Sequence, residues 1–205
     1  MINPSVLNPR PGLILSFLGG CVAMLLLSAL LFLAPVLGFP FLDIPHLVGG
    51  VFFDSPTTAF WVGFWINFVV GAFIFAPALS FFWPMLPGPG VGFRGAILRG
   101  ILWGIALWVL SGVLLPIFAA LNRLGADVVR SPGPFAIATG VRGVVALLGG
   151  HLVYGLALAL IATMGEGIVP LETLGWPGYL KGEVPPGDLL PREERLPEYQ
   201  PVGVR

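Results

Sequence analysis

Four long stretches without charged side chains constrain what this chain can fold into. Leu13 to Gly38, Ser55 to Phe93 and Gly100 to Asn122 contain no charged residue, and Gly143 to Gly165 contains only the ionisable His151. A helix that crosses a bilayer needs about 20 mostly apolar residues. We therefore predict an all-α integral membrane protein, a bundle of four transmembrane helices. The predicted spans cover about residues 13–37, 58–83, 95–121 and 139–164.

The composition excludes several classes of protein. Charged residues make up 10% of the 205 residues and hydrophobic residues 57%, whereas about 25% of residues are charged in a soluble domain. The formal net charge is zero, so no positive field would attract a nucleic acid, and we expect none as a partner. Cys21 is the single cysteine, which excludes an intrachain disulfide. No serine, cysteine or carboxylate neighbours a buried base in the predicted spans, so we expect no catalytic residues and no enzyme.

The distribution of lysine and arginine predicts the orientation. Of the ten such residues, the three on the side opposite the N-terminus are Arg123, Arg130 and Arg142. Cytoplasmic loops of membrane proteins carry the excess of positive charge, so both termini are expected in the cytoplasm and the protein in the inner (plasma) membrane. The first apolar run is much longer than that of a signal peptide, and we expect it to be retained. Arg94 and Arg99 are expected to anchor the third span at lipid head groups.

Two segments outside the spans have distinct compositions. Residues 166–205 hold 11 of the 20 formally charged residues and seven prolines. We predict a transmembrane domain over residues 1–165 and an irregular cytoplasmic tail over 166–205 that lies along a partner. The first outer connection is apolar, with Asp43 suited to cap a helix and Pro45 to its first turn. We expect a short interfacial helix there.

A weak internal repeat relates the two halves of the chain. Spans 1 and 3 end in apolar runs that contain Pro35 and Pro116, and spans 2 and 4 share a polar residue followed four positions later by glycine. Two helical hairpins related by an axis along the membrane normal would produce this pattern. Asn67 and His151 would then face each other near the middle of the membrane, where an unpaired polar group is costly.

Small residues at four-residue spacing predict where helices pack closely. Ala96, Gly100 and Gly104 have this spacing on span 3, Gly63 and Gly71 have it with Asn67 between them on span 2, and Gly155 is a further small residue on span 4. Such residues let helix backbones approach one another in a membrane. The pattern favours contacts within this chain, and contact with a partner subunit is the alternative.

His151 is the main candidate for a cofactor site. Glycines flank it, and Tyr154 lies on the same helix face. It could bind haem or a quinone or relay protons, or it could be a neutral histidine hydrogen-bonded to Asn67 or to a backbone carbonyl. A bis-histidine haem needs a second axial ligand, and the other histidine, His46, is predicted outside the spans. We therefore expect no resident cofactor, with haem as the alternative.

A metal site is a weaker candidate at the outer side. Asp43, His46 and Asp54 carry suitable donor atoms at loose spacing. Helix capping and loop solvation explain these residues more simply, so we predict no metal.

Two segments carry a family resemblance. The run Leu33-Ala-Pro-Val-Leu-Gly-Phe-Pro-Phe-Leu-Asp-Ile-Pro-His-Leu-Val-Gly49 and the later Gly150-His-Leu-Val-Tyr-Gly155 resemble an uncharacterised family of small four-span membrane proteins of bacteria and archaea. Its members are often encoded near haem-copper oxidase genes. The resemblance covers roughly residues 13–164 and implies a respiratory context. Family members often have a histidine where this chain has Asn67, which weakens the transfer of a two-histidine site.

These observations together predict a non-catalytic accessory subunit of a membrane electron-transfer complex, most simply a respiratory oxidase-type assembly. Its partners would be other integral membrane subunits and lipids. Three alternatives stay open: a haem- or quinone-binding protein that uses His151, a small transporter or channel, and a stand-alone assembly factor that leaves before the complex matures.

Overall fold

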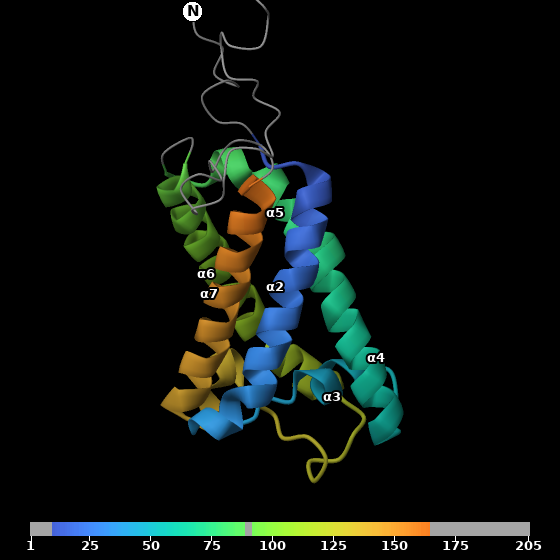
Figure 1. Cartoon of the computed structure of the whole chain (residues 1–205). Helices are drawn as coiled ribbons and strands as arrows, with labels where there is room; N and C mark the ends of the chain where they lie inside the picture. The colour runs from blue at the N-terminus through green and yellow to red at the C-terminus, as the bar shows by residue number, and fades with distance from the viewer. Residues whose placement is uncertain (1–9, 89–91, 165–205) are drawn as a thin grey trace, which may run out of the picture. The chain divides into compact units, whose positions relative to one another are not determined.

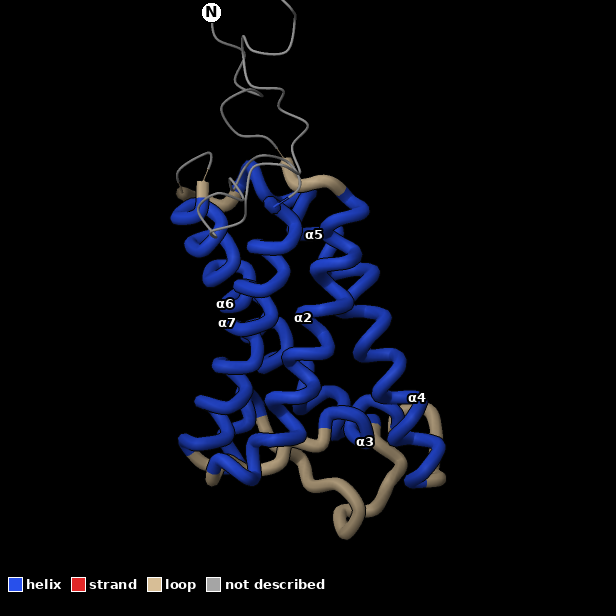
Figure 2. Tube along the Cα trace, viewed as in Figure 1, coloured by secondary structure: helices blue, strands red, loops and turns tan. Residues whose placement is uncertain are grey.

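The structure is a computed structural model that describes residues 10–88 and 92–164. All of its regular elements in these ranges are helices (Figures 1 and 2). In chain order they are α2 (Leu13–Leu33), η1 (Ala34–Leu37), α3 (Ile44–Gly49), α4 (Pro56–Val69), η2 (Val70–Phe75), α5 (Ala76–Phe82), η3 (Trp83–Met85), α6 (Phe93–Leu121), η4 (Pro134–Thr139) and α7 (Val141–Met164). The predicted tail, 166–205, lies outside the described residues.

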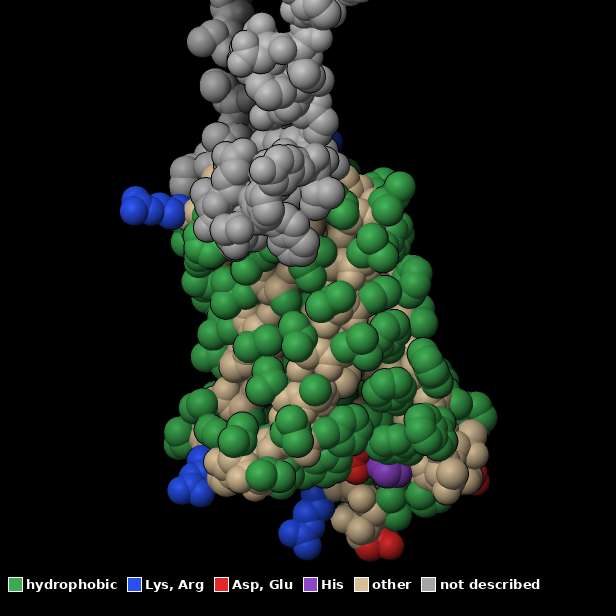
Figure 3. Space-filling model, in the orientation of Figure 1, with side chains coloured by type: hydrophobic (Ala, Val, Ile, Leu, Met, Phe, Trp, Pro, Cys, Tyr) green, Lys and Arg blue, Asp and Glu red, His purple; other side chains and the backbone are tan. Residues whose placement is uncertain are grey.

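The four predicted spans are confirmed as helices long and apolar enough to cross a membrane. They cover Leu13–Leu37, Pro56–Met85, Phe93–Leu121 and Val141–Met164. The fourth begins two residues later than predicted because Gly140, with φ 80°, separates it from η4. Apolar side chains cover the middle of the face in Figure 3, and charged side chains lie at its ends. These features indicate a membrane-spanning protein.

The second span is continuous but irregular. Its middle is the π-helix η2, which follows α4 and precedes α5. Pro77 lies in the first turn of α5, and it lacks the N–H that would bond the carbonyl of Phe73. A wider π turn accommodates such an interruption within a helix. The span therefore changes direction at η2, and α4 diverges from the other helices (Figure 1).

The packing of the bundle is asymmetric. α7 packs along both α2 and α6, and α2 also packs on η2 and α5. An exact two-fold repeat would pack α6 against the second span as α2 packs against α7. Among the described residues, α4 instead packs mainly on α3 and has no comparable pairing with α6. The paired prolines differ too, since Pro35 lies in η1 at the end of its span and Pro116 lies inside α6.

The helix expected in the first connection is present as α3. Its N-cap is Asp43, whose side chain accepts a hydrogen bond from the backbone N–H of His46, and Pro45 lies in its first turn. Pro45, Leu47, Val48 and Gly49 are all buried. The helix therefore packs against α4 and α6 and is not an isolated helix on the surface.

Arg99 differs from its expected role. It is 1% exposed, and its guanidinium lies over the Trp83 ring, 4.7 Å from the centroid. Its Nε donates to the Leu86 carbonyl at 3.2 Å, and Nη2 donates to that of Gly88 at 3.4 Å. The prediction that Arg99 contacts lipid head groups is wrong, because α6 turns this side chain inward to bind the carbonyls that follow the second span. Arg94 is exposed.

Candidate functional site

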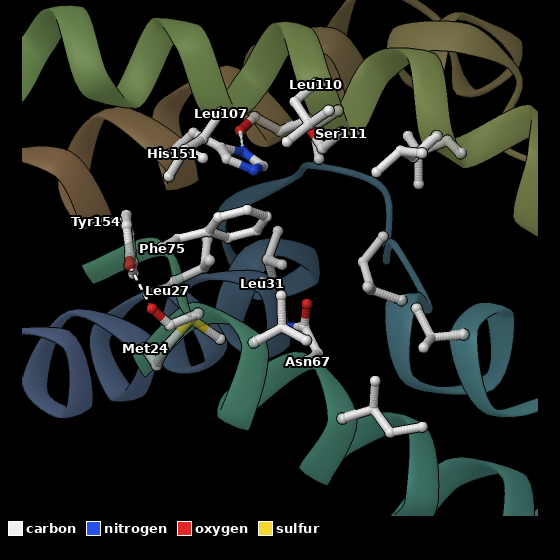
Figure 4. Close-up of a pocket in the computed structure, with 18 of the residues that line it drawn as sticks. Met24, Leu27, Leu31, Asn67, Phe75, Leu107, Leu110, Ser111, His151 and Tyr154 are labelled. Carbon is white, nitrogen blue, oxygen red and sulfur yellow. Dashed lines mark hydrogen bonds between the residues drawn. The ribbon is translucent and has the colours of Figure 1, made fainter. Parts of the chain in front are cut away.

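A cavity of about 160 Å³ lies inside the bundle. Residues from α2, α3, α4, η2, α6 and α7 line it, and most of them are aliphatic or aromatic. Four of the lining side chains are polar: Asn67, Ser111, His151 and Tyr154 (Figure 4). An engineered apolar protein cavity of about 150 Å³ binds benzene. This cavity therefore has room for one six-membered ring.

The asymmetric packing creates the cavity. At one end of the bundle the second span meets α6 through Arg99 and Trp83, and at the other end α3 fills the space between α4 and α6. Between these two closures α4 and α6 make little contact with each other in the described chain. Leu110, a lining residue on α6, is 40% exposed. The side between α4 and α6 is thus the open side of the cavity.

His151 presents one ring nitrogen to the cavity. It lies near the middle of α7, and its ring points into the cavity (Figure 4). Its Nδ1 lies 2.8 Å from the carbonyl oxygen of Leu147. A carbonyl can only accept, so Nδ1 carries the proton and the Nε2 of a neutral ring carries a lone pair. The sequence analysis considered two partners for a neutral His151, the Asn67 side chain and a backbone carbonyl, and the ring bonds to the backbone carbonyl.

Tyr154 joins α7 to the π-helix. Its hydroxyl donates a hydrogen bond to the carbonyl of Gly71 at 2.7 Å, and the residue is 1% exposed. The same carbonyl also accepts the backbone N–H of Ala76. The phenol proton is therefore already used within the protein, and Tyr154 offers the cavity its ring and an oxygen lone pair.

Asn67 lies on the wall opposite His151. It is half-buried and lines both the main cavity and a smaller void of about 20 Å³ next to α3. Within the described residues, no hydrogen bond joins its amide to His151 or to another group. The structure therefore brings the predicted pair to one cavity but leaves space between the two side chains (Figure 4). Its amide can offer a ligand either a donor or an acceptor.

Ser111 is a polar lining residue that the sequence analysis missed. Its Oγ donates to the Trp108 carbonyl at 3.0 Å on the same helix. A serine within a membrane helix commonly satisfies itself in this way. No feature of its surroundings in the sequence distinguishes it from an ordinary helix residue.

A second group of polar residues holds α3, whose Ile44 and Val48 line one end of the cavity. The Nδ1 of His46 lies 2.8 Å from a carboxylate oxygen of Asp43. Asn122 follows α6, and its Nδ2 donates to the carbonyls of His46 and Leu47 at 3.0 and 2.9 Å. Asn122 thus ties α3 to α6, a role that the sequence analysis missed.

The metal site considered for Asp43, His46 and Asp54 does not form in the structure. Asp54 is exposed, and within residues 10–88 and 92–164 no three potential metal-ligating side chains gather.

The small residues make close contacts within this chain. A Cβ on Gly100 would lie 2.7 Å from the Gly155 carbonyl, and one on Gly104 would lie 2.5 Å from that of His151. Ala96 is fully buried on the same helix. On the second span, a Cβ on Gly63 would overlap the carbonyl of Pro45 in α3.

Gly71 makes a further close approach, this time to α2. A Cβ at this position would overlap the sulfur of Met24. The absence of a side chain at Gly71 therefore lets η2 and α2 come together beside the cavity.

No family model, curated protein or solved structure matches this chain. Function is therefore inferred from the geometry and chemistry of the cavity.

Proposed function

We propose that this chain is a membrane-embedded, non-catalytic binding protein whose cavity takes the ring of a quinone-class molecule. The observation that carries the proposal is the cavity itself, an apolar space of about 160 Å³ with polar side chains on opposite walls. Ligand sites in proteins are concave and mostly apolar, and a few placed polar groups set the orientation of the ligand. Quinones have this pattern, an apolar ring with oxygen atoms at opposite ends.

The size of the cavity favours a single ring over haem. The volume is close to that of the engineered cavity that takes one benzene, and a haem macrocycle carries four pyrrole rings. The second histidine also lies in α3, where its Nδ1 is paired with Asp43. His151 therefore has no histidine opposite it for a bis-histidine haem.

The open side of the cavity provides a place for the isoprenoid chain of a membrane quinone. Isoprenoid quinones carry long apolar chains, which need an exit into lipid. The unpacked side between α4 and α6 offers such an exit in the middle of two spans. The ring would lie against His151 and the chain would pass Leu110 toward the bilayer.

The cellular setting rests on the sequence. We propose that both termini are cytoplasmic, that the membrane is the inner (plasma) membrane and that α3 lies at its outer surface. The resemblance to a family encoded near haem-copper oxidase genes supports a role as an accessory subunit of an electron-transfer assembly. A quinone site suits such a role. Among the described residues that line the cavity there is no aspartate, glutamate, lysine or arginine, which weighs against the transporter alternative.

Binding of a one-ring quinone tests the proposal. The protein in quinone-free nanodiscs is titrated with tetramethyl-1,4-benzoquinone and with its hydroquinone in calorimetry. We expect saturable one-site binding of at least one form, weakened at least tenfold in Ser111→Phe, which fills the cavity. Val113→Phe is the matched control, because Val113 is 53% exposed on the same helix. Binding of neither form, or equal binding by both variants, contradicts the proposal.

The accessory role has a separate test. Purification from native membranes in mild detergent, followed by mass spectrometry, should recover electron-transfer subunits in a fixed ratio to this chain. A lone chain or a self-oligomer contradicts that role while leaving quinone binding intact.

A further inference from the structure

We infer that the cavity selects the reduced, hydroxyl-bearing form of its ligand over the quinone. This inference rests on the proposed function and concerns which redox form the same site holds. It follows from the direction of the hydrogen bonds that the polar lining residues already make.

Three of the four polar side chains have committed their protons to the protein. Tyr154 donates to the Gly71 carbonyl at 2.7 Å, and Ser111 donates to the Trp108 carbonyl at 3.0 Å. The Nδ1–H of His151 donates to the Leu147 carbonyl at 2.8 Å. What these three groups leave for a ligand is lone pairs. The wall formed by α6 and α7 therefore accepts hydrogen bonds and donates none from its side chains.

The charge state of His151 keeps this wall an acceptor. Among the residues that the structure describes, none of those that line the cavity is an aspartate or a glutamate. An imidazolium would have no counter-ion there, and a buried unpaired charge is costly. The neutral ring with the proton on Nδ1 is the form that the Leu147 carbonyl favours, and its Nε2 can only accept.

The opposite wall, which carries Asn67, does not distinguish the quinone from the hydroquinone. Asn67 has both an amide N–H and a carbonyl oxygen, and its side chain is free of hydrogen bonds within the described residues. It can donate to a quinone carbonyl or accept from a hydroxyl. The selection therefore comes from the His151 side alone.

The quinone and the hydroquinone differ in what they offer to the Nε2 of His151. A quinone carbonyl beside Nε2 sets lone pair against lone pair and leaves two buried acceptors unsatisfied. A hydroquinone hydroxyl in the same place donates to Nε2 and satisfies both groups. A site that binds the reduced form tenfold more tightly raises the midpoint potential of the bound two-electron couple by about 30 mV.

The two forms of one probe test the inference. Tetramethyl-1,4-benzoquinone and its hydroquinone are titrated separately under anaerobic conditions into the full chain in nanodiscs. We expect the hydroquinone to bind at least about tenfold more tightly. Equal affinity, or tighter binding of the quinone, overturns the selectivity and leaves the proposed binding function standing. Binding of neither form overturns both.

Two variants test the contributions of the two walls to the selectivity separately. His151→Gln replaces an obligate acceptor with an amide that can donate or accept, so the affinity ratio should fall toward one while both forms still bind. Asn67→Ala should weaken both forms by a similar factor and keep the ratio. A ratio unchanged in His151→Gln, or abolished in Asn67→Ala, overturns the assignment of selection to His151.

Discussion

The hydroxyl of Tyr154 donates to the carbonyl of Gly71 across 2.7 Å and joins the middle of α7 to the π-helix of the second span. The bond holds η2 against the bundle beside the point where α4 turns away. It therefore fixes one wall of the cavity as well as joining two spans.

Tyr154→Phe should lower the stability of the folded protein by about 0.5–1.5 kcal/mol, the usual contribution of one hydrogen bond. The ring stays in place, and the Gly71 carbonyl keeps its bond from Ala76. Unfolding in mixed detergent micelles measures the difference. Phe73→Leu, on the exposed side of η2, is the control, and an equal loss in both variants would contradict the role of the bond.

Two glycines of α7 should respond in opposite ways to the same change. Gly155→Ala places a methyl group against the Gly100 carbonyl and should destabilise the protein by about 1–3 kcal/mol through overpacking. Gly149→Ala meets no atom within 4 Å and should stabilise the helix by about 0.5–1 kcal/mol. Thermal unfolding of both variants checks the difference in sign.

Asn122→Asp tests how α3 is held. The substitution removes the donors to the His46 and Leu47 carbonyls but keeps the oxygen that accepts the N–H of Leu124. We expect faster hydrogen exchange at the Gly50 and Phe53 amides, whose bonds depend on α3. Unchanged exchange there would mean that packing alone holds α3 in place.

Arg99→Lys should destabilise the protein by about 1–3 kcal/mol although the charge is kept. A lysine cannot reproduce the two directed bonds to Leu86 and Gly88 or the planar contact with Trp83. Arg94→Lys, at an exposed position of the same helix, should be neutral. Detergent unfolding curves of the two variants give the comparison, and similar curves would contradict this account of Arg99.

The sequence predicted the spans well because length and hydropathy determine them. From the internal repeat it predicted that Asn67 and His151 face each other near the middle of the membrane; in the structure both side chains line one cavity, and among the described residues no hydrogen bond joins them. The space between them was not predictable. It arises because Pro77 and η2 redirect α4, and apolar side chains show the same hydropathy whether they face a cavity, a helix or lipid.

Arg99 illustrates a second limit of sequence analysis. A cation near the end of a span fits head groups or an internal cap equally well by position. The difference depends on helix rotation, which places Arg99 over Trp83 and Arg94 on the surface. Ser111 and Asn122 were missed for a similar reason, because their roles depend on which helix lies opposite.

Photoaffinity labelling tests the central claim most directly. Protein in nanodiscs is illuminated with an azido-substituted one-ring quinone, digested and mapped by mass spectrometry, with unlabelled tetramethyl-1,4-benzoquinone and its hydroquinone as competitors. We predict adducts on cavity-lining residues such as Met24, Phe75 and Leu110, suppressed by the competitors and lost in Ser111→Phe. Labelling confined to exposed positions such as Val113, or insensitive to the competitors, would contradict a quinone-class site in this cavity.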